Sequence, residues 1–262
     1  MSSFYFTSLT AIFLTTIIAF FVLFKGVKTR INQVFFFFLI TLSVGIFGDI
    51  FYFTPLVNFF SPKDVLRCIY IITPFSAPTL LHFIFLFTQI RPFRYLIEFC
   101  YIISGCLCVF NIGIPTFFFQ DVFVSNLGVI NTSVNIGVDC FVIFIIAAVL
   151  GSFFLVIRCL LNSNGRLKEQ MKYYLFASVS IIVAAVVYSI SMSISSNIPR
   201  LDNLFLVFYM GTVAYSITKS ELFQIQLVIS RLFSYGITYS IAAFIYIIGF
   251  TFIKSSNALV FF

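Results

Sequence analysis

A few ionisable side chains lie within long apolar runs, and they are the residues to which chemistry is most readily assigned. Asp49 and Asp139 lie near the ends of two such runs, Arg67 lies at a similar depth in a third, and His82 is the only histidine. A charged group is costly in lipid, so each is a candidate ligand-binding residue. Asp49, Arg67 and Asp139 would form a polar cluster around a ligand. The alternatives are a structural ion pair and side chains that reach the lipid headgroups.

A histidine side chain in water titrates near neutrality, which makes a proton switch one interpretation of the place of His82 between Leu81 and Phe83. A hydrogen bond to a neighbouring helix is the other interpretation, and it is the one that we favour. Glu98 enters the next apolar run at a similar depth and is the candidate partner.

The sequence lacks the motifs that several kinds of chemistry require. The sequence has no metal-binding cluster, phosphate loop or nucleophile elbow, and no lysine inside an apolar run that could hold retinal as a Schiff base. The six cysteines match no zinc or haem spacing, and we expect them to pack as small apolar side chains. A Cys68–Cys140 disulfide is the alternative for that pair. We therefore expect no metal, no cofactor and no enzymatic activity in this chain by itself.

Apolar runs of membrane-spanning length position these residues. The 262-residue sequence is 61% hydrophobic and 9% charged, which matches about eight helices of ~20 residues and leaves no soluble domain. The net charge of +7 then indicates loops that face a membrane surface, and we expect no nucleic-acid partner. The fold predicted is an all-α, polytopic transmembrane helix bundle in the lipid bilayer. The expected spans are residues 4–24, 34–54, 66–89, 95–119, 135–157, 173–194, 204–218 and 232–253.

The gaps between these spans indicate the orientation. Most of the 15 Lys and Arg residues fall in every second gap, including a long basic gap at 158–172, whereas the polar gap at 120–134 has none. Because basic loops stay in the cytoplasm, the N-terminus is expected outside, in a multi-pass protein of the bacterial inner membrane. Pro74 and Pro78 are expected to kink the third span and to free backbone carbonyls inside the bundle.

The second half of the chain carries a recognisable pattern. Residues 166–174 read RLKEQMKYY, and residues 215–235 read YSITKSELFQIQLVISRLFSY. This pattern resembles the seven-helix N-terminal membrane sensor region of bacterial histidine kinases. In that family an AYAI-like run ends the last helix, followed by YRLLDI-like and lvIxRxlvYg-like segments. This chain departs from the family pattern at Ser220, Glu221 and Gln224.

The resemblance implies a membrane input module that couples a ligand or a membrane state to a cytoplasmic histidine kinase or a similar output. The kinase part is absent, so the output would be another domain or protein, and a homodimer is among the open oligomeric states. We divide the chain into a sensor-like domain, 1–218, and a connector with an eighth, truncated span, 219–262. With eight spans and an outside N-terminus, the C-terminus would also be outside, which suggests an incomplete signalling protein.

Residues 219–233 form the candidate transmission segment. As a helix, the segment places Leu222, Ile225 and Ile229 on one stripe and Arg231 on the opposite face. As a strand, apolar and polar residues would alternate. We favour an interfacial helix because the segment joins two spans at the membrane surface.

Two other functions remain open from the sequence. A small-solute transporter or permease component is consistent with a kinked helix and with Asp49, His82 and Asp139 in the membrane. An assembly or scaffold protein without a ligand would tolerate substitution of those residues.

Overall fold

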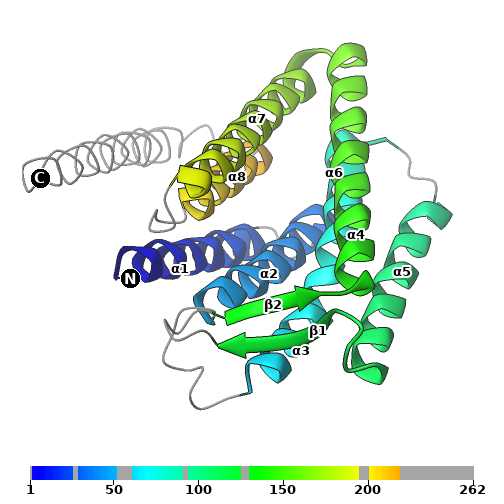
Figure 1. Ribbon diagram of the computed structural model, residues 1–262. Helices are drawn as coiled ribbons and strands as arrows, with labels where there is room; N and C mark the ends of the chain where they lie inside the picture. Colours follow the sequence, from blue (N-terminus) through cyan, green and yellow to red (C-terminus); the bar gives the residue numbers. More distant parts are fainter. Residues whose placement is uncertain are drawn as a thin grey trace, which may run out of the picture. The chain divides into compact units, whose positions relative to one another are not determined.

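The computed structural model describes residues 2–25, 29–51, 61–90, 94–124, 130–194 and 201–218. These residues fall almost wholly in one compact unit, Met1–Ile217; a second unit, Thr218–Phe262, lies outside the described residues except for Thr218. The first unit is a helix bundle with one small β-hairpin (Figure 1). Its elements are α1 (Ser2–Lys25), α2 (Arg30–Phe51), α3 (Pro62–Ile72), the 3-10 turn η2 (Thr73–Phe75), α4 (Ser76–Thr88), α5 (Arg94–Gly113), β1 (Phe119–Val124), β2 (Ile130–Val134), α6 (Ile136–Asn162), α7 (Gly165–Ile194) and α8 (Leu201–Thr218).

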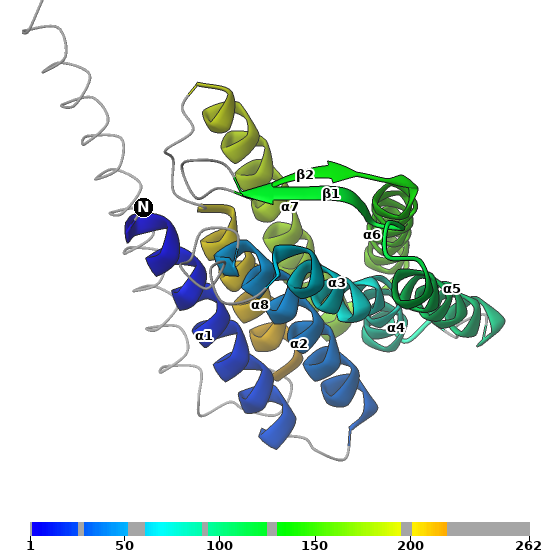
Figure 2. The same ribbon diagram turned by 60° about the horizontal axis from the view of Figure 1, so that its bottom comes forward.

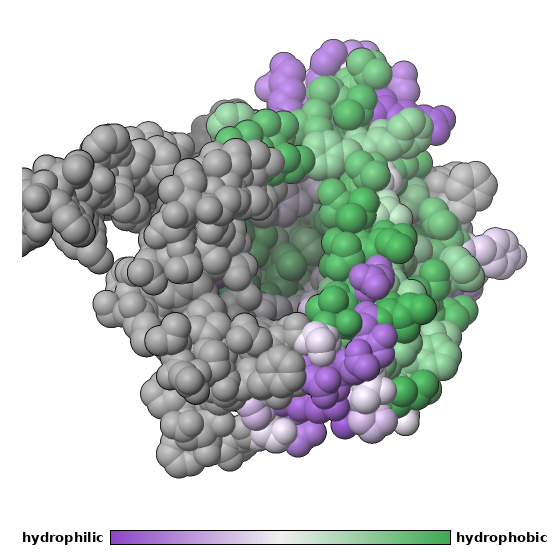
Figure 3. Space-filling view, in the orientation of Figure 1, coloured by the Kyte–Doolittle hydropathy of each residue, from purple (hydrophilic) through white to green (hydrophobic). Residues whose placement is uncertain are grey.

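The helices confirm the expected membrane-embedded, mainly α-helical class. Within the described residues, five stretches are long and apolar enough to cross a bilayer: Thr7–Phe24, Arg30–Gly48, Pro62–Thr88, Tyr95–Gly113 and Ile136–Asn162. Figure 3 shows a mostly hydrophobic belt over the middle of the right-hand part of this face. Hydrophilic residues gather at the α6–α7 turn at one end of the belt and at the hairpin at the other. This is the surface that a bilayer-spanning bundle requires.

The third span is the centre of the bundle. Of its window Pro62–Thr88, 61% is buried, against 22% for the spans in α5 and in α6. α4 packs against α2, α5 and α6, and Figure 2 shows α1, α2 and α4 side by side with α5 and α6 beyond them. Residues Phe35, Phe83 and Phe87 interlock in this core, with the rings of Phe35 and Phe83 4.9 Å apart.

The expected kink in the third span is confirmed as a 3-10 turn between α3 and α4. Neither Pro74 nor Pro78 has an N–H, so the carbonyls of Tyr70 and Pro74 lose the donors that an unbroken helix would supply. The turn divides the span into a half that leads to the hairpin end and a half that leads to the α6–α7 end.

The polar gap after α5 contains a hairpin that the sequence reading missed. α5 ends at Gly113, earlier than the expected 119, and β1 pairs antiparallel with β2, with an irregularity between Phe119 and Asp121. Lys63 of α3 donates to the carbonyl of Gln120 at this irregularity, over 3.3 Å. Asn135 then caps α6, because its side chain accepts from the Ile136 N–H at 2.8 Å. The hairpin is thus fixed to both neighbouring helices.

The basic gap expected at 158–172 is mostly helix, which corrects that boundary. Only Ser163 and Asn164 separate α6 from α7, and Gly165 adopts a φ of 61° that suits a residue without a Cβ. The segment RLKEQMK contains good helix formers, and Lys172 pairs with Glu169 at 2.7 Å one turn away. Helix propensity therefore extends α7 well ahead of the expected span at Tyr173.

Candidate functional site

Arg67 joins the hairpin-end half of the third span to α5. Its Nη2 donates to the carbonyls of Asn111 and Ile112, both over 3.1 Å, and Asn111 Nδ2 returns a bond to Arg67 O over 2.8 Å. The last carbonyls of a helix lack intrahelical donors, so the guanidinium acts as a cap on α5. Arg67 therefore has a structural role at the end of α5, whatever else it binds.

Ser104 of α5 contacts the third span at the kink itself. Its hydroxyl is completely buried and donates to Pro74 O over 2.9 Å. The amide that would donate to Pro74 O in an unbroken helix belongs to Pro78, which has no hydrogen to give. Ser104 thus supplies, from a second helix, the donor that Pro78 withholds.

His82 and Tyr101 join the other half of the third span to α5. His82 Nδ1 lies 3.4 Å from the Tyr101 hydroxyl, and the two rings meet edge to face with centroids 6.2 Å apart. The expected interhelical hydrogen bond is therefore present, and its partner is Tyr101. Glu98, the candidate from sequence, lies on the same helix one turn away and is exposed.

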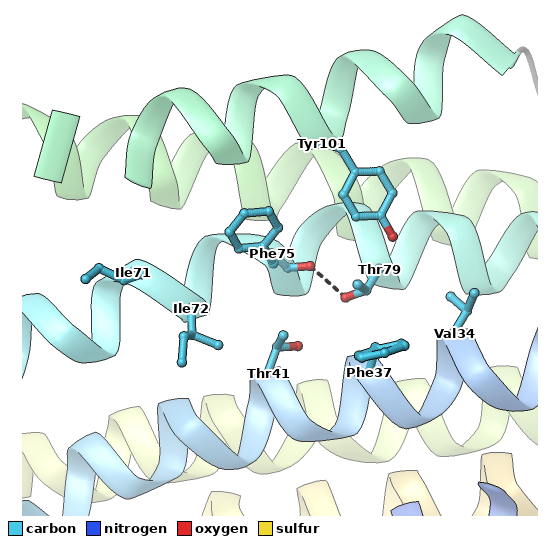
Figure 4. Close-up of a pocket in the computed structure, with 8 residues that line it drawn as sticks. All are labelled: Val34, Phe37, Thr41, Ile71, Ile72, Phe75, Thr79 and Tyr101. Atoms are coloured by element: carbon cyan, nitrogen blue, oxygen red, sulfur yellow. Dashed lines mark hydrogen bonds between the residues drawn. The ribbon is translucent and has the colours of Figure 1, made fainter. Parts of the chain in front are cut away.

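A cavity of about 370 Å³ adjoins this interface, between α2, the kink and α5 (Figure 4). Tyr101 extends its hydroxyl toward Thr79 of α4, and α2 closes the opposite side. The hydroxyls of Thr79 and Thr41 donate to carbonyls of their own helices, Phe75 O at 2.7 Å and Phe38 O at 2.8 Å. The rest of the lining is apolar: Val34, Phe37, Ile71, Ile72 and Phe75.

These features define a site suited to an apolar molecule with one polar group. Its most adaptable polar group is the Tyr101 hydroxyl, which lines the cavity and also contacts His82. A ligand that engaged this hydroxyl would compete with the His82 contact, which is long for a hydrogen bond. Occupancy of the cavity and packing of α4 on α5 would then depend on one another.

The remaining residues predicted from sequence are not brought to this site. Asp139 lies exposed in the first turn of α6, where a carboxylate complements the helix dipole. No ion pair joins it to Arg67 in the part of the chain that the structure describes. The Asp49 side chain lies outside the described structure, as do all the transmission candidates, Leu222, Ile225, Ile229 and Arg231. All six cysteines are free thiols, Cys68 and Cys140 included.

Three contributors were not singled out from the sequence: Tyr101, Ser104 and Asn111. Each is a polar residue inside an otherwise apolar run, which is typical of interhelical hydrogen bonding. A search of the apolar runs for uncharged polar residues would have found all three.

Comparisons with known proteins do not assign this chain to a family. No protein-family model matches the chain, and no curated protein or solved structure was found to be similar to it.

Proposed function

We propose that this chain is an integral membrane sensor module that couples a ligand or a membrane state to a signalling output such as a cytoplasmic histidine kinase. The observation that carries the proposal is the third span, which is interrupted at its centre and bonded to α5 on both sides of the interruption. Arg67 holds one half, Ser104 holds the kink, and Tyr101 contacts the other half through His82.

This arrangement supports a two-state mechanism. The two halves of the span make separate polar contacts, so one can shift along α5 while the other stays bonded. A ligand shifts such an equilibrium only by binding the two packings differently. The cavity beside Tyr101 meets this requirement, because a molecule in it would contact α2, the kink and α5 at once.

The two packings can be tested by distance measurement. Cys68 on α3 and Cys106 on α5 are both exposed and take spin labels once the other four cysteines are replaced. The labelled protein is placed in nanodiscs of short-chain and of long-chain phosphatidylcholine, and the label–label distances are measured by pulsed EPR. A sensor of membrane state is expected to show two distances whose proportions change with the lipid.

A matched pair within one helix provides the control. Tyr95 of α5 is 83% exposed, so Tyr95→Cys labelled together with Cys106 should give one distance in both lipids. Cross-linking in native membranes, followed by affinity purification, tests the output directly. A single α3–α5 distance in every lipid, together with no kinase, cyclase or phosphatase among the captured proteins, would count decisively against a sensor.

Transport is the second candidate function, and the interrupted third span is the observation that favours it. Broken helices at the centre of a bundle form the solute sites of many transporters. Flux into proteoliposomes under ion gradients, with the Ser104→Ala variant compared against wild type, would support transport and weaken the sensor proposal.

A further inference from the structure

Two cavities follow one another along α2 and form a single groove. The cavity beside Tyr101, of about 370 Å³, adjoins a second of about 420 Å³, and Ile72 at the end of α3 lines both. Figure 4 shows the first of them, with side chains of α2 facing those of the third span. One wall of the groove is a stripe of α2: Val34, Phe37, Thr41, Val44 and Phe47. This stripe is about 20 Å long at 1.5 Å per residue, so the groove is elongated.

The groove is open along its length, and it is apolar. Phe37 is 59% exposed, Phe47 45% and Ile72 41%, although all three side chains are large and apolar. α2 and the third span are both long and apolar enough to cross a bilayer, so an open groove between them contacts lipid. An apolar cavity of about 150 Å³ holds a benzene molecule, so either cavity accepts a longer stretch of hydrocarbon. This shape suits the acyl chain of a lipid.

The hairpin end of the groove carries a negative charge. Asp64 lies exposed in the first turn of α3, at the start of the third span, and lines the second cavity. Its carboxylate makes no ion pair with a residue that the structure describes. The nearby cations are engaged elsewhere, because Lys63 donates to a carbonyl of the hairpin and Arg67 to carbonyls of α5. Of the described residues that line the groove, Asp64 alone is charged.

We infer that this groove binds a phospholipid with a primary ammonium head, the head at Asp64 and one acyl chain along α2 toward Tyr101. The ammonium group donates hydrogen bonds to the carboxylate, whereas a trimethylammonium head has no hydrogen to donate. The chain contacts α2, the kink and α5, whose packing is variable in the sensor proposal. As the ligand of a sensor, the lipid rests on that proposed function.

Fluorescence quenching tests the choice of headgroup. The chain has no tryptophan, so Phe47→Trp places a single reporter in the groove. The variant is reconstituted in phosphatidylcholine bilayers that contain a rising share of a chain-brominated lipid, either phosphatidylethanolamine or phosphatidylcholine. Half-maximal quenching is expected at an about threefold lower share of the ethanolamine lipid, as one exposed ion pair implies. Equal quenching by the two lipids would overturn the inference.

Phe110→Trp provides the matched control for this reporter. Phe110 is 49% exposed near the hairpin end of α5, and it lines neither cavity. Both brominated lipids should quench it equally, because lipid there meets an open helix surface. The same preference at Phe110→Trp as at Phe47→Trp would mean that the groove is not its source, and would refute the assignment.

Asp64→Asn tests the head-binding residue, since it keeps the size of the side chain and removes its charge. In the Phe47→Trp background it should abolish the preference for the ethanolamine lipid. A preference that survived this substitution would leave Asp64 with only its interaction with the N-terminus of α3, and would refute its role in the site.

Photo-cross-linking tests the position of the acyl chain. A phosphatidylethanolamine with a diazirine at the end of a hexadecanoyl chain is irradiated with the wild-type protein in bilayers, and mass spectrometry identifies the modified residues. Adducts are expected on Val34 and Phe37. Val44→Phe narrows the groove, so it should lower these adducts at least fivefold and leave those on the exposed Ile146 of α6 unchanged. Adducts on Val34 and Phe37 that Val44→Phe does not lower would refute the groove.

The two proposals fail separately. Quenching and cross-linking measure lipid binding, and neither depends on a change in the α3–α5 distance. Selective lipid binding with a fixed α3–α5 distance would refute the sensor and keep the lipid site. Two α3–α5 distances without lipid selectivity would refute the lipid site and keep the sensor.

Discussion

Ser104→Ala is the substitution that most directly probes the kinked span. It removes a buried hydroxyl that donates to Pro74 O over 2.9 Å and, within its own helix, to Cys100 O over 3.2 Å. Solvent does not reach this position, since Ser104 is 0% exposed. Pro74 O therefore loses its donor from α5, and Pro78 cannot replace that donor.

Two reference magnitudes, one from soluble proteins and one from membrane proteins, set the expected loss in the free energy of unfolding. An orphaned buried polar group costs about 1–3 kcal/mol in soluble proteins. Interhelical hydrogen bonds in membranes average about 0.6 kcal/mol and reach about 1.7, because the unfolded helices also find partners. The Pro74 carbonyl lacks its ordinary helical donor, so we expect the upper part of that range, a loss of about 1–2 kcal/mol in the free energy of unfolding.

Restoring the missing amide should rescue the loss. Pro78→Ala returns an N–H that can donate to Pro74 O, so Ser104→Ala in that background should cost under about 0.5 kcal/mol. The cycle is measured by unfolding in mixed detergent–SDS micelles, followed by far-UV circular dichroism. Ser180→Ala is the control, because Ser180 donates to the Phe176 and Ala177 carbonyls of its own helix. If Ser104→Ala costs the same with and without the Pro78→Ala substitution, the reasoning is refuted.

Three further predictions concern other parts of the bundle. Gly137→Ala would place a Cβ 2.6 Å from a backbone carbonyl and should cost about 1–3 kcal/mol in the same unfolding assay, whereas Gly105→Ala, with nothing within 4 Å, should be neutral or stabilising. Arg67→Met should cost about 1–2 kcal/mol by uncapping the last carbonyls of α5, and Arg67→Lys less; equal losses would contradict the two-carbonyl cap. If the N-terminus is outside, a membrane-impermeant maleimide applied to intact cells should label Gln120→Cys, which lies exposed in the hairpin outside the spans, as a mass shift; labelling only after lysis would reverse the orientation.

The features that the sequence predicted correctly depend only on residues that are close together in the chain. A span needs only an unbroken apolar run, so the helices at Arg30–Phe51 and Ile136–Asn162 follow from composition and length alone. The kink follows from Pro74 and Pro78 in the same way, because a proline removes its own donor wherever it lies.

What the sequence did not reveal depends on how helices are rotated against each other. Nothing near Ser104 in the chain indicates that it meets Pro74, and Glu98 was considered for His82 because depth alone does not distinguish it from Tyr101 on the next turn. The hairpin was missed because its strands are short and separated by a polar turn, so that alternation gives a weak signal.

The contact between α8 and α1 has a consequence for how the protein is made. Asn203 Nδ2 donates to Ser8 Oγ over 3.0 Å, and the two buried residues are 195 positions apart in the chain. At translation rates of about 5–20 residues per second, α1 enters the membrane on the order of 10–40 s before its partner is synthesised. During that interval Ser8 must find a temporary partner in its own helix, a lipid headgroup or an insertion factor. Closure of the bundle is therefore a late step in biogenesis, set by the ribosome as much as by the packing of the helices.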